Sequence, residues 1–156
     1  MIERVSVLEL EDSALFPRLA PEMPPTLMIV SDDFHLTTAM EVICDFLGLG
    51  IEQIPTEGDA VRMARDFRPV AIMVSAEGEG QDGFHVMKGV AEIDPDMPIM
   101  LLTGDDPAMM GAADAIESLF GLTAVTKTPG LPSVGEIVDF LFRAGRRGGW
   151  FRAMQA

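Results

Sequence analysis

The sequence contains no tyrosine, one tryptophan and one cysteine. A single thiol cannot close an internal disulfide, so cysteine pairing does not hold this fold together. Cys44 has the apolar neighbours Val42, Ile43 and Phe46, which favours a core side chain over a nucleophile. We therefore expect a protein of a reducing compartment, the cytoplasm.

Long apolar runs are also missing. The apolar blocks, such as 27–30 and 99–102, are far shorter than the roughly 18 to 20 residues needed to cross a bilayer. The N-terminus carries Glu3 and Glu9 and lacks the basic and apolar regions of a secretory signal. The sequence predicts neither a membrane span nor secretion.

Positive charge is scarce, with 11 basic residues against 25 acidic ones and a net charge of −14. Such a surface repels nucleic acid and anionic lipid, so we expect neither as a partner. The distribution is uneven, however. Residues 143–156 hold four arginines and no acid, whereas the rest of the chain holds seven basic residues and all 25 acids.

The chain has 156 residues and is 48% hydrophobic, enough for one domain with a single core. Prolines 17, 21, 24 and 25 separate an N-terminal stretch from the rest. We expect an N-terminal extension over 1–25, a domain over 26–145 and an arginine- and aromatic-containing tail over 146–156.

Short apolar runs alternate with helical patterns after Pro25. Leu36, Met40, Ile43 and Leu47 are spaced as one buried helix face, and weaker helical patterns follow near 61–67, 84–90, 116–119 and 134–141. The predicted strands are 27–30, 50–54, 70–74, 98–102 and 122–126. This alternation predicts an α/β fold, a doubly wound five-stranded parallel sheet between two helical layers. Ligand chemistry in such sheets belongs at the carboxyl ends of the strands.

Polar side chains follow four of the predicted strands. They are Ser31, Asp32, Ser75, Thr103 and Lys127. Because the carboxyl ends of parallel strands lie along one edge of the sheet, we expect these residues to converge on one crevice.

Three motifs resemble the CheY-like receiver domain of bacterial two-component response regulators, over about residues 26–145. Residues 27–33 are similar to its first strand and acidic corner. Residues 69–75, followed by Asp82-Gly83-Phe84, are similar to its third strand and Asp-Gly turn. Residues 97–104 are similar to its fourth strand and signalling threonine. The resemblance implies a flavodoxin-like three-layer fold. It also implies a site in which carboxylates bind Mg²⁺ and an aspartate accepts a phosphoryl group held by lysine and threonine.

The chain departs from this family at the site itself. Ser75 aligns with the phosphorylated aspartate, and Ser31 aligns with one of the metal-binding acids. Ala124 stands three residues before Lys127, where many receivers have an aromatic switch, and Thr128 separates Lys127 from the proline that usually follows it. These departures predict a pseudo-receiver that is not an enzyme and holds no metal or cofactor. In it Asp32 would pair with Lys127.

We therefore expect a phosphorylation-independent adaptor that binds a signalling protein and forms a homodimer through its C-terminal half. The expected partner-binding residues are Met109, Met110, Arg143, Arg146, Arg147, Trp150, Phe151 and Arg152. Three alternatives stay open at this point. The arginines could sense an anionic small molecule such as a cyclic dinucleotide, the tail could pack on the domain, or Glu77 and Glu79 could rebuild a phosphoryl-accepting metal site with Asp32.

Overall fold

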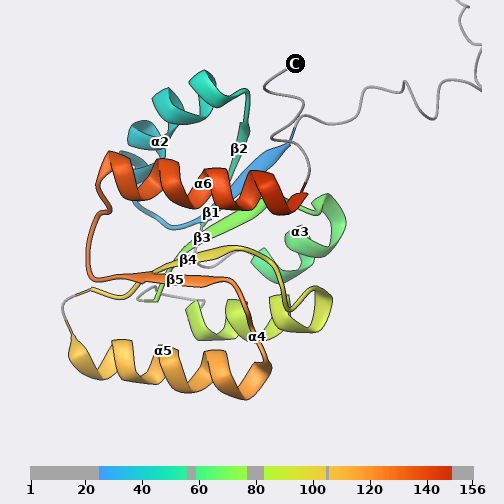
Figure 1. Cartoon of the computed structure of the whole chain (residues 1–156), viewed down its shortest axis with the longest axis vertical. Coiled ribbons are helices and arrows are strands. Elements are labelled where there is room, and N and C mark those ends of the chain that lie inside the picture. The colour runs from blue at the N-terminus through green and yellow to red at the C-terminus, as the bar shows by residue number, and fades with distance from the viewer. Residues whose placement is uncertain (1–24, 56–58, 77–82, 105, 149–156) are drawn as a thin grey trace, which may run out of the picture.

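The computed structural model describes residues 25–55, 59–76, 83–104 and 106–148, which form alternating strands and helices (Figure 1). In chain order the elements are β1 (Thr26–Val30), α2 (Phe34–Leu47), β2 (Gly50–Ile54), α3 (Ala60–Phe67), β3 (Ala71–Ser75), α4 (Gly83–Ile93), β4 (Ile99–Leu102), α5 (Pro107–Phe120), β5 (Val125–Thr128) and α6 (Val134–Gly148). None of these helices is long and apolar enough to cross a membrane.

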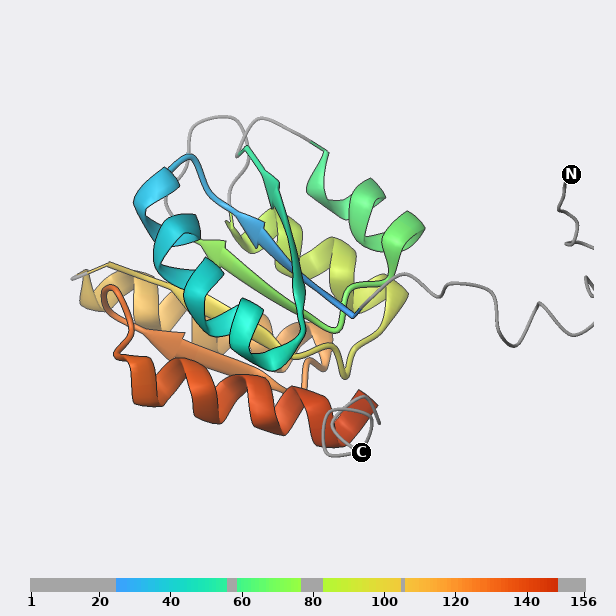
Figure 2. The same ribbon diagram turned by 90° about the horizontal axis from the view of Figure 1, so that it is seen from above.

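The strands form one parallel sheet in the order β2-β1-β3-β4-β5. Helices α2 and α6 cover one face, and α3, α4 and α5 cover the other (Figures 1 and 2). The predicted doubly wound, three-layer fold is confirmed. Its strand order is that of the flavodoxin-like, CheY-like fold.

Both faces of the three central strands are buried, which explains why β1, β3 and β4 are almost continuously apolar. In β1, Leu27 and Ile29 join the core under α2 and α6, whereas Met28 and Val30 join the core on the opposite face. Alternate side chains of a strand point to opposite faces, so each face needs its own apolar set.

Local capping fixes where helices begin and end next to the sheet. Asp33 caps α2 by accepting a hydrogen bond from the His35 N–H at 2.8 Å, and Asp106 caps α5 by accepting one from the Ala108 N–H at 2.9 Å. Gly48 and Gly121 directly follow the ends of the same two helices, and both lie in the left-handed region that glycine tolerates.

The fifth strand differs from its prediction. It spans Val125–Thr128 rather than 122–126, because the preceding residues terminate α5. The Leu122 N–H donates to the Glu117 carbonyl at 3.0 Å, and the Leu122 side chain is buried. Leu119, expected on the buried face of this helix, is 75% exposed.

The C-terminal helix is longer than its apolar pattern. It continues to Gly148, so the boundary expected at residue 145 falls within α6, and Arg146 and Arg147 lie in its last turn. The expected extension over 1–25 and the end of the tail lie almost wholly outside the described residues.

Candidate functional site

The carboxyl ends of β1, β3 and β4 bring most of the predicted crevice residues to one edge of the sheet. Ser75 is the last residue of β3 and is in register with Leu102, so Thr103 follows directly on the neighbouring strand. Ser31 and Thr103 are buried, and Ser75 is half-buried. The structure therefore places these three residues, and Asp32 after Ser31, along one edge of the sheet.

The two acids that follow Ser31 have different roles. Asp33 caps α2, and its own N–H donates to the Ser31 hydroxyl at 3.0 Å. Asp32 is exposed and lines a small cavity of about 190 Å³ together with Ser31, Gln53 and Pro55. Asp32 is therefore the carboxylate that faces this part of the crevice.

Gln53 is a site residue that the sequence analysis missed. Its side-chain amide donates to the Ser31 carbonyl at 2.9 Å and accepts from the Thr37 hydroxyl at 2.6 Å. These bonds tie β1, β2 and α2 together at the crevice. The sequence feature that could have identified Gln53 is its position as a polar residue near the carboxyl end of the second predicted strand.

Lys127 is not in the crevice, which corrects the sequence analysis. Its ammonium group bonds to Asp114 at 3.0 Å and also to Glu117, both on α5. Partial burial lowers the pKa of Lys127, but the hydrogen bonds and charges of Glu117 and Asp114 outweigh it, so this pKa lies above its ordinary value. The expected pairing with Asp32 is wrong, since Asp32 is not among the charges that act on Lys127.

Thr128, the last residue of β5, is the β5 residue that bonds to Thr103 at the end of β4. Its side chain is buried, and its carbonyl accepts hydrogen bonds from the Thr103 N–H at 2.8 Å and the Thr103 hydroxyl at 3.3 Å. Successive side chains of a strand point to opposite faces, so Lys127 faces α5 and Thr128 does not. Pro129 follows Thr128 directly, as proline follows the lysine in receivers. The residue three before Thr128 is then Val125, which packs against the core.

The crevice does not suit the magnesium site that the resemblance implies. Ser31 and Ser75 offer hydroxyl groups where carboxylates are expected, and Mg²⁺ prefers charged oxygen ligands. Among the described residues, no three His, Cys, Asp or Glu side chains are grouped so that they could hold a metal ion. Glu77 and Glu79 lie outside those residues.

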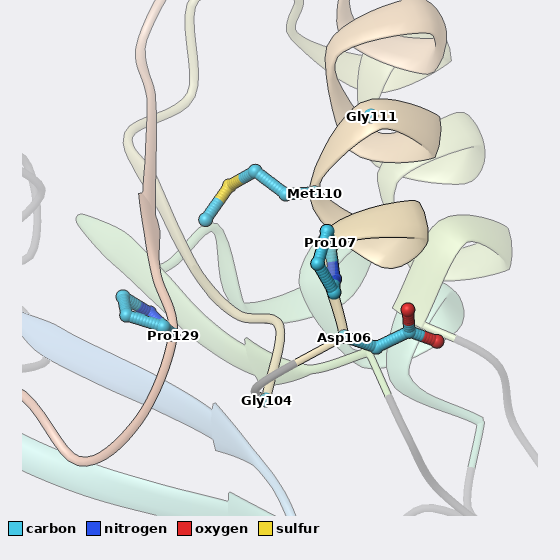
Figure 3. A pocket seen from close by; sticks show the side chains of 6 residues that line it. All are labelled: Gly104, Asp106, Pro107, Met110, Gly111 and Pro129. Carbon is cyan, nitrogen blue, oxygen red and sulfur yellow. The ribbon is translucent and has the colours of Figure 1, made fainter.

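A second cavity, of about 280 Å³, lies beside the β4–α5 connection (Figure 3). It is lined by Gly104, Asp106, Pro107, Met110, Gly111 and Pro129. Met110 extends from α5 toward the segment that carries Pro129 (Figure 3). The two predicted contact methionines therefore differ, because Met109 packs against the core and Met110 lines this cavity.

The arginines predicted as a binding group are partly engaged in ion pairs. Arg143 bonds to Asp139 at 3.1 Å, one helical turn away. Arg147 bonds to Asp94 at the end of α4, and Arg146 is exposed. Trp150, Phe151 and Arg152 lie outside the described residues.

The chain is similar in sequence to the transcriptional regulatory protein AfsQ1 of Streptomyces coelicolor. The two are 28% identical over 130 residues, which cover 80% of this chain and 52% of AfsQ1. The match thus spans about half of that relative's length. No protein-family model matches the chain.

Solved structures of receiver domains share the fold. A receiver domain protein from Clostridium thermocellum matches with a TM-score of 0.64 at 12% identity, covering 80% of this chain and 97% of that one. The receiver domain of the sensor histidine kinase PA1611 from Pseudomonas aeruginosa, which has a magnesium ion coordinated in its active-site cleft, matches with a TM-score of 0.59 at 21% identity, covering 76% and 95%. This chain therefore has the CheY-like fold of response-regulator receiver domains, with Ser31, Ser75 and Thr103 at the carboxyl ends of β1, β3 and β4.

Proposed function

We propose that this chain is a receiver-like signalling domain that binds partner proteins and does not accept a phosphoryl group in its crevice. The observation that carries the proposal is the register of β5. It turns Lys127 toward Asp114 and Glu117 and leaves Thr128 beside Thr103. With Ser31 and Ser75, this makes three departures from the phosphoryl-accepting site.

The chemistry of phosphoryl transfer explains why these departures matter. A receiver needs a carboxylate nucleophile, and it needs cations to neutralise the charge on the transferred group. Hydroxyl groups at positions 31, 75 and 128 supply neither. The proposed domain is accordingly not an enzyme and requires no metal cofactor.

The proposed binding surface comprises α5, β5 and α6. The ion pairs of Lys127 join β5 to α5, and Val125 provides no aromatic ring that could change position. A surface held in one conformation costs a partner little reorganisation. The cavity beside Met110 offers an adaptable apolar contact.

We propose a second copy of the chain as one partner, alongside a signalling protein. Leu119 presents an exposed apolar side chain on α5, and the arginines near the C-terminus are opposite in charge to the acidic body. Nucleic acid and membrane are not proposed as partners. The cyclic-dinucleotide alternative has less support, because Arg143 and Arg147 already contact carboxylates.

The test is incubation with acetyl phosphate and Mg²⁺ followed by intact mass measurement. The wild-type chain and Ser75→Asp should gain no phosphoryl adduct, whereas the triple variant Ser31→Asp, Ser75→Asp, Thr128→Lys should gain one that hydroxylamine removes. A triple variant that carries Lys127→Met as well should behave the same, because Lys127 faces α5. Phosphorylation of a crevice residue in the wild-type chain would contradict the proposal.

A further inference from the structure

Helix α2 carries an exposed apolar ridge on the side that faces away from the sheet. Its inner face buries Leu36, Met40 and Leu47, as the sequence pattern predicted, together with Cys44, whereas Ile43 of that pattern is only partly buried. Val42 and Phe46, one turn apart, are 75% and 88% exposed. Phe46 is the most exposed large apolar side chain among the described residues. Such a ridge is typical of a contact surface.

The charge beside this ridge restricts what can cover it. Glu41 and Asp45 are exposed on α2, and the helix contains no lysine or arginine. An occupant that is apolar and carries positive charge would therefore fit best, whereas an acidic one would be repelled.

The chain itself contains a segment of this kind. Residues 13–21 read Ser-Ala-Leu-Phe-Pro-Arg-Leu-Ala-Pro, and Arg18 is their only charged residue. Leu15, Phe16 and Leu19 give the segment its large apolar side chains. Residues 1–12 are unsuitable by comparison, because they carry four acids and a single arginine.

The segment is attached next to the ridge. The Pro25 carbonyl accepts from the Gly50 N–H at 2.9 Å, and the Leu49 N–H donates to the Cys44 carbonyl at 2.8 Å. Residue 25 therefore lies close to the last turn of α2, which carries Phe46. An extended chain covers about 3.3 Å per residue, so the residues between Phe16 and Pro25 reach roughly 30 Å, whereas a helix of this length is about 21 Å long.

Proline lowers the entropic cost of docking this segment. Pro17, Pro21 and Pro24 fix their own φ angles and restrict the residues before them to extended conformations. Attachment through a short linker also gives the segment an effective concentration on the order of millimolar.

We propose that residues 13–21 dock on the α2 ridge of the same molecule. Phe16 and Leu19 cover Val42 and Phe46, and Arg18 lies beside Asp45. The proposal is independent of the crevice and of the proposed adaptor function. A partner that uses the α2 surface must first displace the segment.

Thiol accessibility tests this in the full chain. Val42→Cys and Leu131→Cys introduce thiols at two exposed positions, 75% and 69% exposed in the described structure, and Leu131 lies outside α5, β5 and α6. Each variant is treated with iodoacetamide, and modification is followed by intact mass. Adding Phe16→Ser and Leu19→Ser should speed the modification of Val42→Cys about tenfold, equivalent to about 1.4 kcal/mol, and should leave the modification rate of Leu131→Cys unchanged. The matched change Val5→Ser and Leu8→Ser should affect neither.

Two results would overturn the proposal. The first is an equal modification rate of Val42→Cys with and without Phe16→Ser and Leu19→Ser. The second is protection of Val42→Cys that increases with protein concentration, because this would mean that a second copy covers the ridge. A circular dichroism melt of each variant confirms that the fold is retained.

Discussion

At the residue scale, the position of one side chain along β5 decides the chemistry of the crevice. Lys127 and Thr128 are neighbours in the sequence but face opposite sides of the strand. The cation therefore neutralises two carboxylates on α5 and does not reach the strand-end crevice. Among the described residues, what remains there is the exposed carboxylate of Asp32 and a set of hydroxyl groups.

Lys127→Met should destabilise the fold, because it removes the cation shared by Asp114 and Glu117 and leaves two carboxylates close together. We expect a loss of about 1 to 2 kcal/mol, since the group is only partly screened by water. Urea unfolding measures it. Lys88→Met, at an exposed position on α4, is the control and should change the stability by less than about 0.5 kcal/mol. Equal effects of the two changes would mean that the α5 contacts contribute nothing.

Cys44 should make the fold sensitive to alkali. Burial, with a smaller contribution from Asp45, raises the pKa of this thiol from 9.0 to about 11. The unfolded chain then loses a proton that the folded chain keeps, so stability is intact below pH 9 and falls as the pH rises toward 11. The full decrease in the free energy of unfolding is about 2 to 3 kcal/mol.

Urea unfolding of the wild type and Cys44→Ala between pH 8.5 and 10.5 checks this expectation. Lys127, whose pKa is raised from 10.5, is present in both proteins, so its titration cancels in the difference between them. The wild type should lose stability across this range, and Cys44→Ala should lose much less. Parallel slopes in the two proteins would show that the thiol is not responsible.

At the element scale, the start of α4 is packed tightly against the end of β3. A Cβ added at Gly83 would lie 2.6 Å from the Ser75 carbonyl oxygen and 2.7 Å from the Ala76 Cα. These are backbone atoms, so the neighbours cannot move aside without shifting β3. The close approach explains why the predicted Asp-Gly turn has glycine at this place.

Gly83→Ala should therefore destabilise the fold by about 2 kcal/mol or more through steric strain. Gly111→Ala is the matched control on α5, because an added Cβ there meets nothing within 4 Å. Alanine has the higher helix propensity, so this control should gain up to about 1 kcal/mol. Thermal unfolding of both variants measures the difference, and a neutral Gly83→Ala would show that the two elements are less tightly packed than described.

At the scale of the whole molecule, the net charge of −14 opposes self-association, so a homodimer needs apolar anchors as well as arginines. Exposed ion pairs contribute only about 0 to 1 kcal/mol each. Arg147 is moreover held by Asp94, which joins the ends of α6 and α4. The aromatic pair Trp150 and Phe151 is therefore the expected anchor.

The double change Trp150→Ala and Phe151→Ala should shift the chain from dimer to monomer in light scattering. Arg152→Ala should weaken the dimer by no more than about fivefold, corresponding to about 1 kcal/mol. The effect of the arginine should also decrease in high salt. A wild-type chain that is monomeric at high protein concentration, or a dimer insensitive to the double change, would contradict the proposed assembly.

The sequence by itself determined the fold, because burial on both faces of a parallel sheet requires short apolar strands that alternate with amphipathic helices along the chain. The apolar runs of the central strands, the helix face of Leu36, Met40 and Leu47, and polar residues after four of the predicted strands were enough to predict the layers and the edge that carries the crevice. The positions of Ser31, Asp32, Ser75 and Thr103 followed from that edge.

Only the tertiary structure decided which side chains complete the site. Leu122 could begin a strand or end a helix, and its hydrogen bond to Glu117 settles the choice in favour of the helix. That choice moves β5 along the chain and turns Lys127 toward α5. The exposure of Val42 and Phe46 also could not be predicted from the sequence, because the identity of an apolar helix residue does not show whether another element covers it. A strand's register and a helix's outer contacts depend on neighbours distant in sequence, so local patterns cannot specify them.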